Sequence, residues 1–144
     1  AGLGQGRALR VAWPSPHGRW VEVGFDEPRP IPALAKAGTA DATFALWSDA
    51  HPGITYLALR CKDADGEVYE WRTDLPNPGQ AGWRTVTIRI DPAQPACHWP
   101  TKEAGAAPAF PLSAQGFAVA FAGIEAPAGS VLIDNLAIAA PATR

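Results

Sequence analysis

The sequence predicts an all-β domain, an antiparallel sandwich or barrel of about eight short strands. Three observations lead to this prediction. Turn-forming residues, among them 15 Pro and 14 Gly, recur at short intervals along the chain. The stretches between them alternate apolar and polar residues and are rich in Val, Ile, Thr, Phe and Trp. No window carries a convincing helical period, since Gly38 and Thr39 interrupt the Ala-rich stretch 32–42.

The size and composition of the chain exclude several classes of protein. Its 144 residues are one domain's worth, with 47% hydrophobic and 18% charged residues, which argues against intrinsic disorder. The formal net charge is −2 and no basic stripe is present, so nucleic acid is not an expected partner. No apolar run is long enough to span a bilayer, so a membrane is not expected either. Because the chain contains no Met, we expect residues 1–144 to be a single module excised from a longer protein.

Eight stretches of the chain have the length and the two-residue period of β-strands, with turn residues between them. They are residues 7–13, 20–25, 42–47, 54–62, 67–73, 83–90, 116–122 and 131–139. In the first, Leu9, Val11 and Trp13 share one face, and Pro14 ends the strand. Each strand is therefore expected to have one buried face and one open face.

The first three strands contain three of the tryptophans. In the second strand the valines and Phe25 share the inward face, which leaves Trp20 and Glu22 on the opposite one. The third strand ends at Trp47. Because tryptophan packs into cores more often than it serves as a ligand platform, Trp13 and Trp47 are expected in the core.

The fourth and fifth strands form a predicted hairpin. In the fourth, Cys61 lies on the apolar face and Tyr56 and Arg60 on the opposite one. The Asp-Gly pair at 65–66 is the strongest short-range hairpin signal. The Asp-x-Asp-Gly string around it also looks like a calcium loop, but its Gly comes too early for the EF-hand spacing. In the fifth strand, Trp71 is assigned to the open face.

The last three strands follow the same alternation. In the sixth, Val86 and Ile88 point inward, and Trp83 is expected to cap the edge of the core. The seventh strand has aromatic and branched residues on one face and alanines such as Ala118 on the other, which suits close packing against another layer. The eighth is apolar except near Asp134, a carboxylate that would need partners if buried.

The segment between the sixth and seventh strands, residues 91–113, contains several prolines and no strand period. A connection of this length without regular structure is usually functional or disordered. It carries the adjacent residues Cys97, His98 and Trp99. His98 and Trp99 either line a binding cleft from this loop or plug one end of the barrel.

The order of these segments resembles the non-catalytic carbohydrate-binding modules with a galactose-binding-like β-sandwich, which is a jelly roll. The segments that carry the resemblance are 20–23, 42–49, 57–60, 63–67, 82–87, 98–99 and 131–136. The resemblance implies a module appended to a glycan-active enzyme, in the extracellular space or the periplasm. Its implied partners are a polysaccharide or oligosaccharide and the catalytic domain of the same polypeptide.

Sugars present an apolar C–H face and a rim of hydroxyls, so a protein binds them with open aromatic rings beside charged or amide side chains. The residues that fit this requirement are Trp20, Glu22, Tyr56, Arg60, Trp71, His98 and Trp99. An exposed aromatic face of this kind usually marks a binding surface. The alternative is that a second sheet covers these aromatic residues, which would then belong to the core.

Two further expectations depend on the resemblance. It implies no required cofactor, but a structural calcium ion at Asp134; the alternative is a turn or hydrogen-bonding role for Asp134 and Asn135. If the protein is exported, Cys61 and Cys97 could form a disulfide. The alternative is two free thiols, one of them buried.

No catalytic activity is expected. The sequence has no GxSxG or HExxH motif and no glycine loop that would cradle phosphate. Glutamates such as Glu22 and Glu70 could supply a glycosidase pair, but nothing in the sequence brings two of them together. The leading hypothesis is therefore a non-catalytic polysaccharide-binding module that targets a tethered enzyme to its substrate. The alternative is a structural spacer packed against a catalytic domain, with no ligand of its own.

Overall fold

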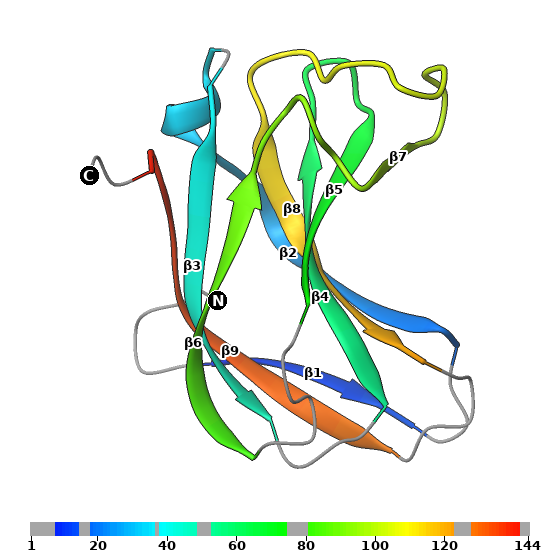
Figure 1. Cartoon of the computed structure of the whole chain (residues 1–144), viewed down its shortest axis with the longest axis vertical. Coiled ribbons are helices and arrows are strands. Elements are labelled where there is room, and N and C mark those ends of the chain that lie inside the picture. The colour runs from blue at the N-terminus through cyan, green and yellow to red at the C-terminus, as the bar shows by residue number, and fades with distance from the viewer. Residues whose placement is uncertain are drawn as a thin grey trace.

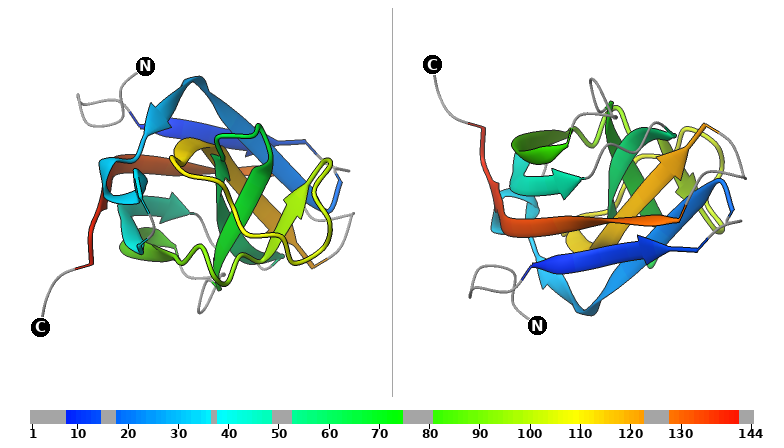
Figure 2. Two further views of the ribbon diagram at one scale, coloured as in Figure 1. Left: turned by 90° about the horizontal axis from the view of Figure 1, so that it is seen from above. Right: turned by 90° about the horizontal axis from the view of Figure 1, so that it is seen from below.

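The strands lie in two sheets that face each other, and every pair of neighbours is antiparallel (Figures 1 and 2). The computed structural model describes residues 8–14, 18–36, 38–48, 53–74, 81–122 and 128–141. The four-stranded sheet has the order β1 (Leu9–Trp13), β9 (Gly129–Ala139), β3 (Ala40–Ser48) and β6 (Gly82–Ile90). The five-stranded sheet has the order β2 (Trp20–Pro30), β8 (Ser113–Phe121), β4 (Ile54–Lys62), β5 (Val68–Asp74) and β7 (Cys97–Trp99).

The connections between the sheets confirm the predicted β-sandwich. Strands β1 to β4 alternate between the two sheets, β4 and β5 form a hairpin, and β5, β6, β8 and β9 alternate back. This is the connectivity of an eight-stranded jelly roll, and its eight strands correspond to the eight that the sequence predicts. A single 3-10 turn, η1 (Pro32–Leu34), is the helical element of the described residues. None of the described helical segments is long and apolar enough to span a membrane.

Aromatic contacts join the two sheets across the core. Phe44 of β3 packs edge-on against Phe117 of β8, with ring centroids 5.1 Å apart. Trp13 of β1 packs against Phe121 of β8 in the same way at 4.9 Å. Such pairs contribute about 0.5–1.5 kcal/mol each beyond the apolar area they bury. The inward faces are otherwise filled mainly with Leu, Ile, Val and Ala, together with Cys61 and the rings of Tyr69 and Trp71.

The tryptophans of the four-stranded sheet divide between its two faces. Trp13 is buried in the core, as predicted. The core prediction is wrong for Trp47 and Trp83, which lie opposite each other on the outer face of β3 and β6, with Trp83 56% exposed. The alternation of β3 is the reason, because Phe44 and Leu46 occupy its inward positions and leave the outward ones to Trp47.

The β4–β5 hairpin closes as predicted, around the buried carboxylate of Asp63. The Oδ1 atom of Asp63 accepts hydrogen bonds from the backbone N–H groups of Asp65 and Glu67, both at 2.9 Å. Gly66 has a φ of +87°, a conformation that an L-residue with a side chain rarely adopts. The turn therefore depends on both residues, Asp63 for its hydrogen bonds and Gly66 for its backbone.

The same hairpin holds the long proline-containing connection in place. The Oδ2 atom of Asp63 accepts hydrogen bonds from the N–H of Ala109, at 2.9 Å, and from the Lys102 ammonium group. Glu67 is buried, and its two oxygens accept hydrogen bonds from the N–H groups of Thr101 and Lys102, both at 2.9 Å. These contacts hold the connection beside β5, where residues 97–99 form the unpredicted strand β7 (Figure 1).

Candidate functional site

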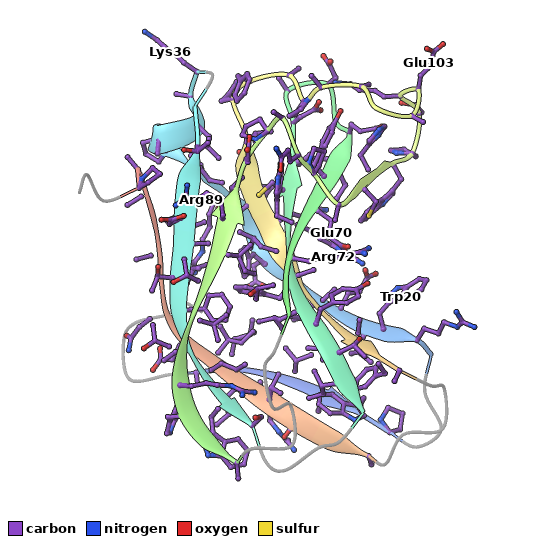
Figure 3. The ribbon with its side chains drawn as sticks, in the orientation of Figure 1. Trp20, Lys36, Glu70, Arg72, Arg89 and Glu103 are labelled. Atoms are coloured by element: carbon purple, nitrogen blue, oxygen red, sulfur yellow. The ribbon has the colours of Figure 1, made fainter. Side chains whose placement is uncertain are left out.

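A pocket of about 390 Å³ opens on the outer face of the five-stranded sheet. Its volume lies in the range of small-ligand sites. Strands β2, β4, β5 and β7 each contribute two lining residues, namely Trp20, Glu22, Tyr56, Arg60, Glu70, Arg72, Cys97 and Trp99. We call this hollow the Glu70 pocket. Figure 3 shows Trp20, Glu70 and Arg72 on the same side of the molecule.

A charged network forms the floor of the Glu70 pocket. Glu70 is 2% exposed, and its two oxygens accept hydrogen bonds from Arg60 Nε at 3.1 Å and Arg72 Nε at 2.6 Å. The Cys97 thiol adds a 3.5 Å contact to the oxygen that Arg72 binds. On its other side Arg60 forms an ion pair with Glu22, whose side chain is 60% exposed. A buried carboxylate is tolerated only when it is paired in this way.

Three aromatic rings stand over this floor. The Arg60 guanidinium lies 4.9 Å from the ring centroid of Trp99, and the Arg72 guanidinium lies 4.4 Å from that of Tyr56. Both are within the range of cation–π attraction, which holds the rings and the cations in one arrangement. Trp20 on β2 is 56% exposed and forms the opposite wall.

Small residues on β8 leave the middle of this sheet face without protruding side chains. From Gly116 to Ala120 the outward residues of β8 are glycine and alanine, and Ala120 lies directly between Trp20 of β2 and Tyr56 of β4. At Gly116 a Cβ atom would lie 2.1 Å from the carbonyl oxygen of Val23, so no side chain fits there. The alanines that the sequence assigns to close packing therefore lie beneath the side chains of β2 and β4.

The structure brings five of the seven predicted ligand-binding residues together. Those that line the Glu70 pocket are Trp20, Glu22, Tyr56, Arg60 and Trp99. The prediction that Trp71 lies on the open face is wrong, because Trp71 is 3% exposed on the core face of β5. Its indole Nε1 donates a hydrogen bond to the carbonyl oxygen of Asp91 at 2.8 Å, which satisfies the polar atom of a buried ring.

His98 also lies outside the Glu70 pocket. It follows Cys97 on β7, so its side chain projects to the opposite side of the strand from Trp99. Its ring stacks on Tyr69 with centroids 4.9 Å apart, and its Nδ1 lies 2.8 Å from an oxygen of Glu67. His98 therefore belongs to the contacts that fix the long connection.

The pocket contains three residues that the sequence analysis did not assign to it, namely Glu70, Arg72 and Cys97. A signal for the first two is present in the sequence. In β5 the charged residues at 70 and 72 alternate with aromatic residues at 69 and 71, so charge marks the open face. Cys97 carries no such signal, because its position depends on the pairing of β7 with β5.

The two cysteines are free and lie on opposite faces of the five-stranded sheet. Cys61 is fully buried in the core, and burial raises its pKa to about 12. Burial and the nearby Glu70 carboxylate raise the pKa of the Cys97 thiol. Of the two alternatives for these cysteines, the structure supports free thiols.

The comparisons with known proteins agree on the fold. No protein-family model matches the sequence, and no curated protein matches it either. A solved exo-beta-agarase matches 95% of this chain with a TM-score of 0.56 and 14% identity, and the match spans 20% of the agarase chain. A CBM4 structure matches with a TM-score of 0.50 and 16% identity, over 98% of this chain and 89% of that one. The family 11 carbohydrate-binding module of the cellulosomal cellulase Lic26A-Cel5E of Clostridium thermocellum matches with a TM-score of 0.51 and 12% identity, over 98% and 80%.

The chain has the fold of a carbohydrate-binding module. At these identities the likeness concerns the fold, and the functional argument depends on the residues of the site. The Glu70 pocket lies on the outer face of one sheet of this fold, where a ligand can reach it.

Asp134 lies on β9, away from the Glu70 pocket. Its Oδ1 accepts a hydrogen bond from the N–H of Asn135 at 2.8 Å, and Asn135 has a φ of +55°. The pairing of β9 with β3 shifts register there, between Thr43 and Ala45. Within the described part of the chain, no three His, Cys, Asp or Glu side chains form a group that could hold a metal ion. Calcium binding at Asp134 stays a prediction.

Proposed function

We propose that this chain is a non-catalytic module that binds a polysaccharide or oligosaccharide in the Glu70 pocket. The observation that carries the proposal is the convergence of three aromatic rings with two arginines and two glutamates, joined by three ion pairs, on one open hollow. An aromatic ring offers an apolar platform for the C–H face of a sugar. A hydroxyl both donates and accepts hydrogen bonds, so it suits the guanidinium donors of Arg60 and Arg72 and the exposed carboxylate of Glu22.

The charged network would favour binding because it preorganises the side chains of the site before the ligand arrives. Glu70 holds both guanidinium groups, and each of these lies over an aromatic ring. Side chains that are already fixed lose little conformational freedom when a ligand arrives. Burial raises the pKa of Tyr56, with Arg72 opposing it, so the Tyr56 hydroxyl stays protonated and can donate a hydrogen bond.

The same contacts argue against catalysis in this pocket. A glycosidase needs one carboxyl group as proton donor and a second as nucleophile or base. Two carboxylates, Glu22 and Glu70, do line the pocket, but Arg60 lies between them and pairs with both. The proposed role is therefore to hold a glycan close to a catalytic domain of the same exported polypeptide, which raises the local concentration of substrate.

Affinity gel electrophoresis in a panel of plant, algal and bacterial polysaccharides tests this proposal. Trp20→Ala and Trp83→Ala form a matched pair, because both side chains are 56% exposed but only Trp20 lines the pocket. We expect at least one polysaccharide to retard the protein. Trp20→Ala and Trp99→Ala should weaken that binding about tenfold or more, and Trp83→Ala should leave it unchanged.

Two results would overturn the proposal. One is a folded protein that no polysaccharide in the panel retards. The other is a loss of retardation that is the same in Trp20→Ala and Trp83→Ala, because binding would then not depend on the Glu70 pocket.

One observation favours a second candidate, the structural spacer. Trp83 is exposed beside Trp47 on the outer face of the four-stranded sheet, where a neighbouring catalytic domain could pack. Because this face and the Glu70 pocket lie on different sheets, the two functions are compatible. A folded chain that binds no glycan in the panel would leave the spacer as the favoured function.

A further inference from the structure

We infer that a hollow within the long connection binds an extended peptide with small apolar side chains. The hollow has a volume of about 580 Å³, which lies in the range of ligand sites. Residues 92–98 form one wall, and residues 102 and 104–107 form the other. We call it the His98 hollow. Both walls belong to the segment that runs from β6 through β7 to β8 (Figure 1).

The ring of His98 is held in one arrangement at this hollow. Its side chain is 9% exposed, it stacks on Tyr69, and its Nδ1 lies 2.8 Å from Oε2 of Glu67. Burial acts to raise the pKa of Glu67, but hydrogen bonds, that of the Thr101 N–H foremost, hold it below its ordinary range. The Glu67 carboxylate is therefore ionised and can only accept, so Nδ1 of His98 carries the proton.

The second ring nitrogen of His98 is left as an acceptor. In a neutral imidazole with its proton on Nδ1, the Nε2 atom has a free lone pair. Among the residues that the structure describes, none donates a hydrogen bond to this atom. A side chain that is nine-tenths buried at a hollow, with an unused acceptor, favours a ligand that donates a hydrogen bond there.

Lys102 adds a donor to the same hollow. Its ammonium group contacts Oδ2 of Asp63 and, at 3.0 Å, Oδ2 of Asp65. An ammonium group has three hydrogens, so one is left for a ligand. The two carboxylates offset the positive charge of Lys102, and the hollow therefore does not favour an anion. It offers one donor and one acceptor to an uncharged polar group.

The rest of the wall favours a peptide over a sugar. It consists mainly of proline and alanine, such as Pro92, Pro95 and Ala104, and its lining includes no Trp, Tyr or Phe among the described residues. A sugar hydroxyl could bond to His98 and Lys102, but its ring would find no aromatic platform like those of the Glu70 pocket. A peptide group has both an N–H and a C=O, and small apolar side chains beside it would pack on the proline and alanine wall.

Strand β7 separates the His98 hollow from the Glu70 pocket. Trp99 lines the pocket alone, His98 lines the hollow alone, and Cys97 between them lines both. The two sites therefore lie on opposite sides of the strand and can be occupied together. Peptide binding would attach this module to a protein partner, and it does not depend on whether the Glu70 pocket binds a glycan.

Phage selection from a random heptapeptide library on the unmodified chain provides the probe for this site, and fluorescence anisotropy of the enriched peptide measures its affinity. Ala96→Phe and Ala35→Phe form a matched pair, because both alanines are exposed but only Ala96 lines the hollow. We expect Ala96→Phe to weaken binding about tenfold or more and Ala35→Phe to leave it unchanged. His98→Asn keeps an N–H group for Glu67 but removes the Nε2 acceptor, so it should weaken binding about tenfold.

Several results would overturn the inference. One is a selection on the folded chain that enriches no heptapeptide. Another is an enriched peptide that binds Ala96→Phe as tightly as the unmodified chain, or that loses its affinity in Trp20→Ala, because it would then occupy a different site. Displacement of the peptide by cellohexaose or xylohexaose would assign the hollow to a glycan instead. If His98→Asn does not fold, the Ala96→Phe and Ala35→Phe pair decides the question.

Discussion

Glu70 is the residue on which the electrostatics of the pocket depend. Its carboxylate is almost fully buried and holds the guanidinium groups of Arg60 and Arg72 at hydrogen-bond distance. Removing one partner of a buried ion pair leaves the others uncompensated, and this costs more than the pair itself contributes. Glu22 pairs with the same Arg60, but in solvent, where an ion pair contributes little.

Glu70→Gln and Glu22→Gln therefore make a matched test. Both changes remove one negative charge from Arg60 and keep the shape of the side chain. Because only Glu70 is buried, we expect Glu70→Gln to lower the free energy of unfolding by about 2–3 kcal/mol and Glu22→Gln by less than about 1 kcal/mol. Urea unfolding at neutral pH measures both. Equal losses in the two variants would show that burial of Glu70 does not set its contribution.

At the same scale, the alternation of side chains along single strands shows how much of the site the sequence could predict. Strand parity groups Trp20 with Glu22 and Tyr56 with Arg60, and the structure keeps both groupings on the pocket face. It fails for Trp71, because aromatic rings with one polar atom suit either face of a strand. The carbonyl oxygen of Asp91 satisfies the Trp71 indole inside the protein, and a contact so far along the chain leaves no local pattern.

At the scale of the element, β7 exists because of contacts made elsewhere. It has only three residues, and its own sequence has no strand period. The carboxylates of Asp63 and Glu67 bind the connection around it through backbone N–H groups, so their part in the fold could not be predicted from side-chain patterns. Two pocket residues, Cys97 and Trp99, depend on this strand.

Asp63→Asn should therefore loosen the connection and β7 with it. The change removes a carboxylate oxygen that accepts from Ala109 and Lys102. We expect amide hydrogen exchange across residues 97–109 to speed up about tenfold or more, while exchange in β8 stays slow. Asp65→Asn is the matched control, because Asp65 is exposed and also contacts Lys102. If both variants exchange alike, the buried carboxylate is not what holds β7.

At the scale of the whole molecule, alternation along the chain predicted eight strands and a sandwich, but it misassigned the faces at Trp47 and Trp71. A two-residue period separates Trp47 from Leu46 without saying which of them points inward. The burial of Leu46 depends on the facing sheet, which is built from strands distant in sequence. The general preference of tryptophan for protein cores therefore favoured Trp47 for the core, whereas the packed sandwich places it on the outer face.

The stability of the molecule should fall in acid, because two buried carboxylates are ionised in the fold. Burial acts to raise the pKa values of Asp63 and Glu67, but hydrogen bonds from Ala109 and Lys102 to Asp63, and from Thr101 and His98 to Glu67, outweigh it and hold both pKa values below their ordinary range. The unfolded chain then binds more protons than the folded one at mildly acidic pH, so stability rises with pH there.

The expected profile follows from the signs of these shifts. The ionised carboxylates of Asp63 and Glu67 contribute fully to the free energy of unfolding above their ordinary pKa of about 4. This contribution is lost as the pH falls through the lower pKa values of the folded state. Hydrogen bonding to Asp63 raises the pKa of Lys102. The ammonium group of Lys102 therefore stabilises the fold at neutral pH, and this stabilisation is lost only in strong base. Urea midpoints measured from about pH 7 to about pH 3 should therefore fall steeply toward the acid end. The double variant Asp63→Asn, Glu67→Gln should have a lower urea midpoint at neutral pH, and this midpoint should fall less toward the acid end. A double variant whose midpoint falls as steeply as that of the unmodified chain would assign the acid sensitivity to other carboxylates.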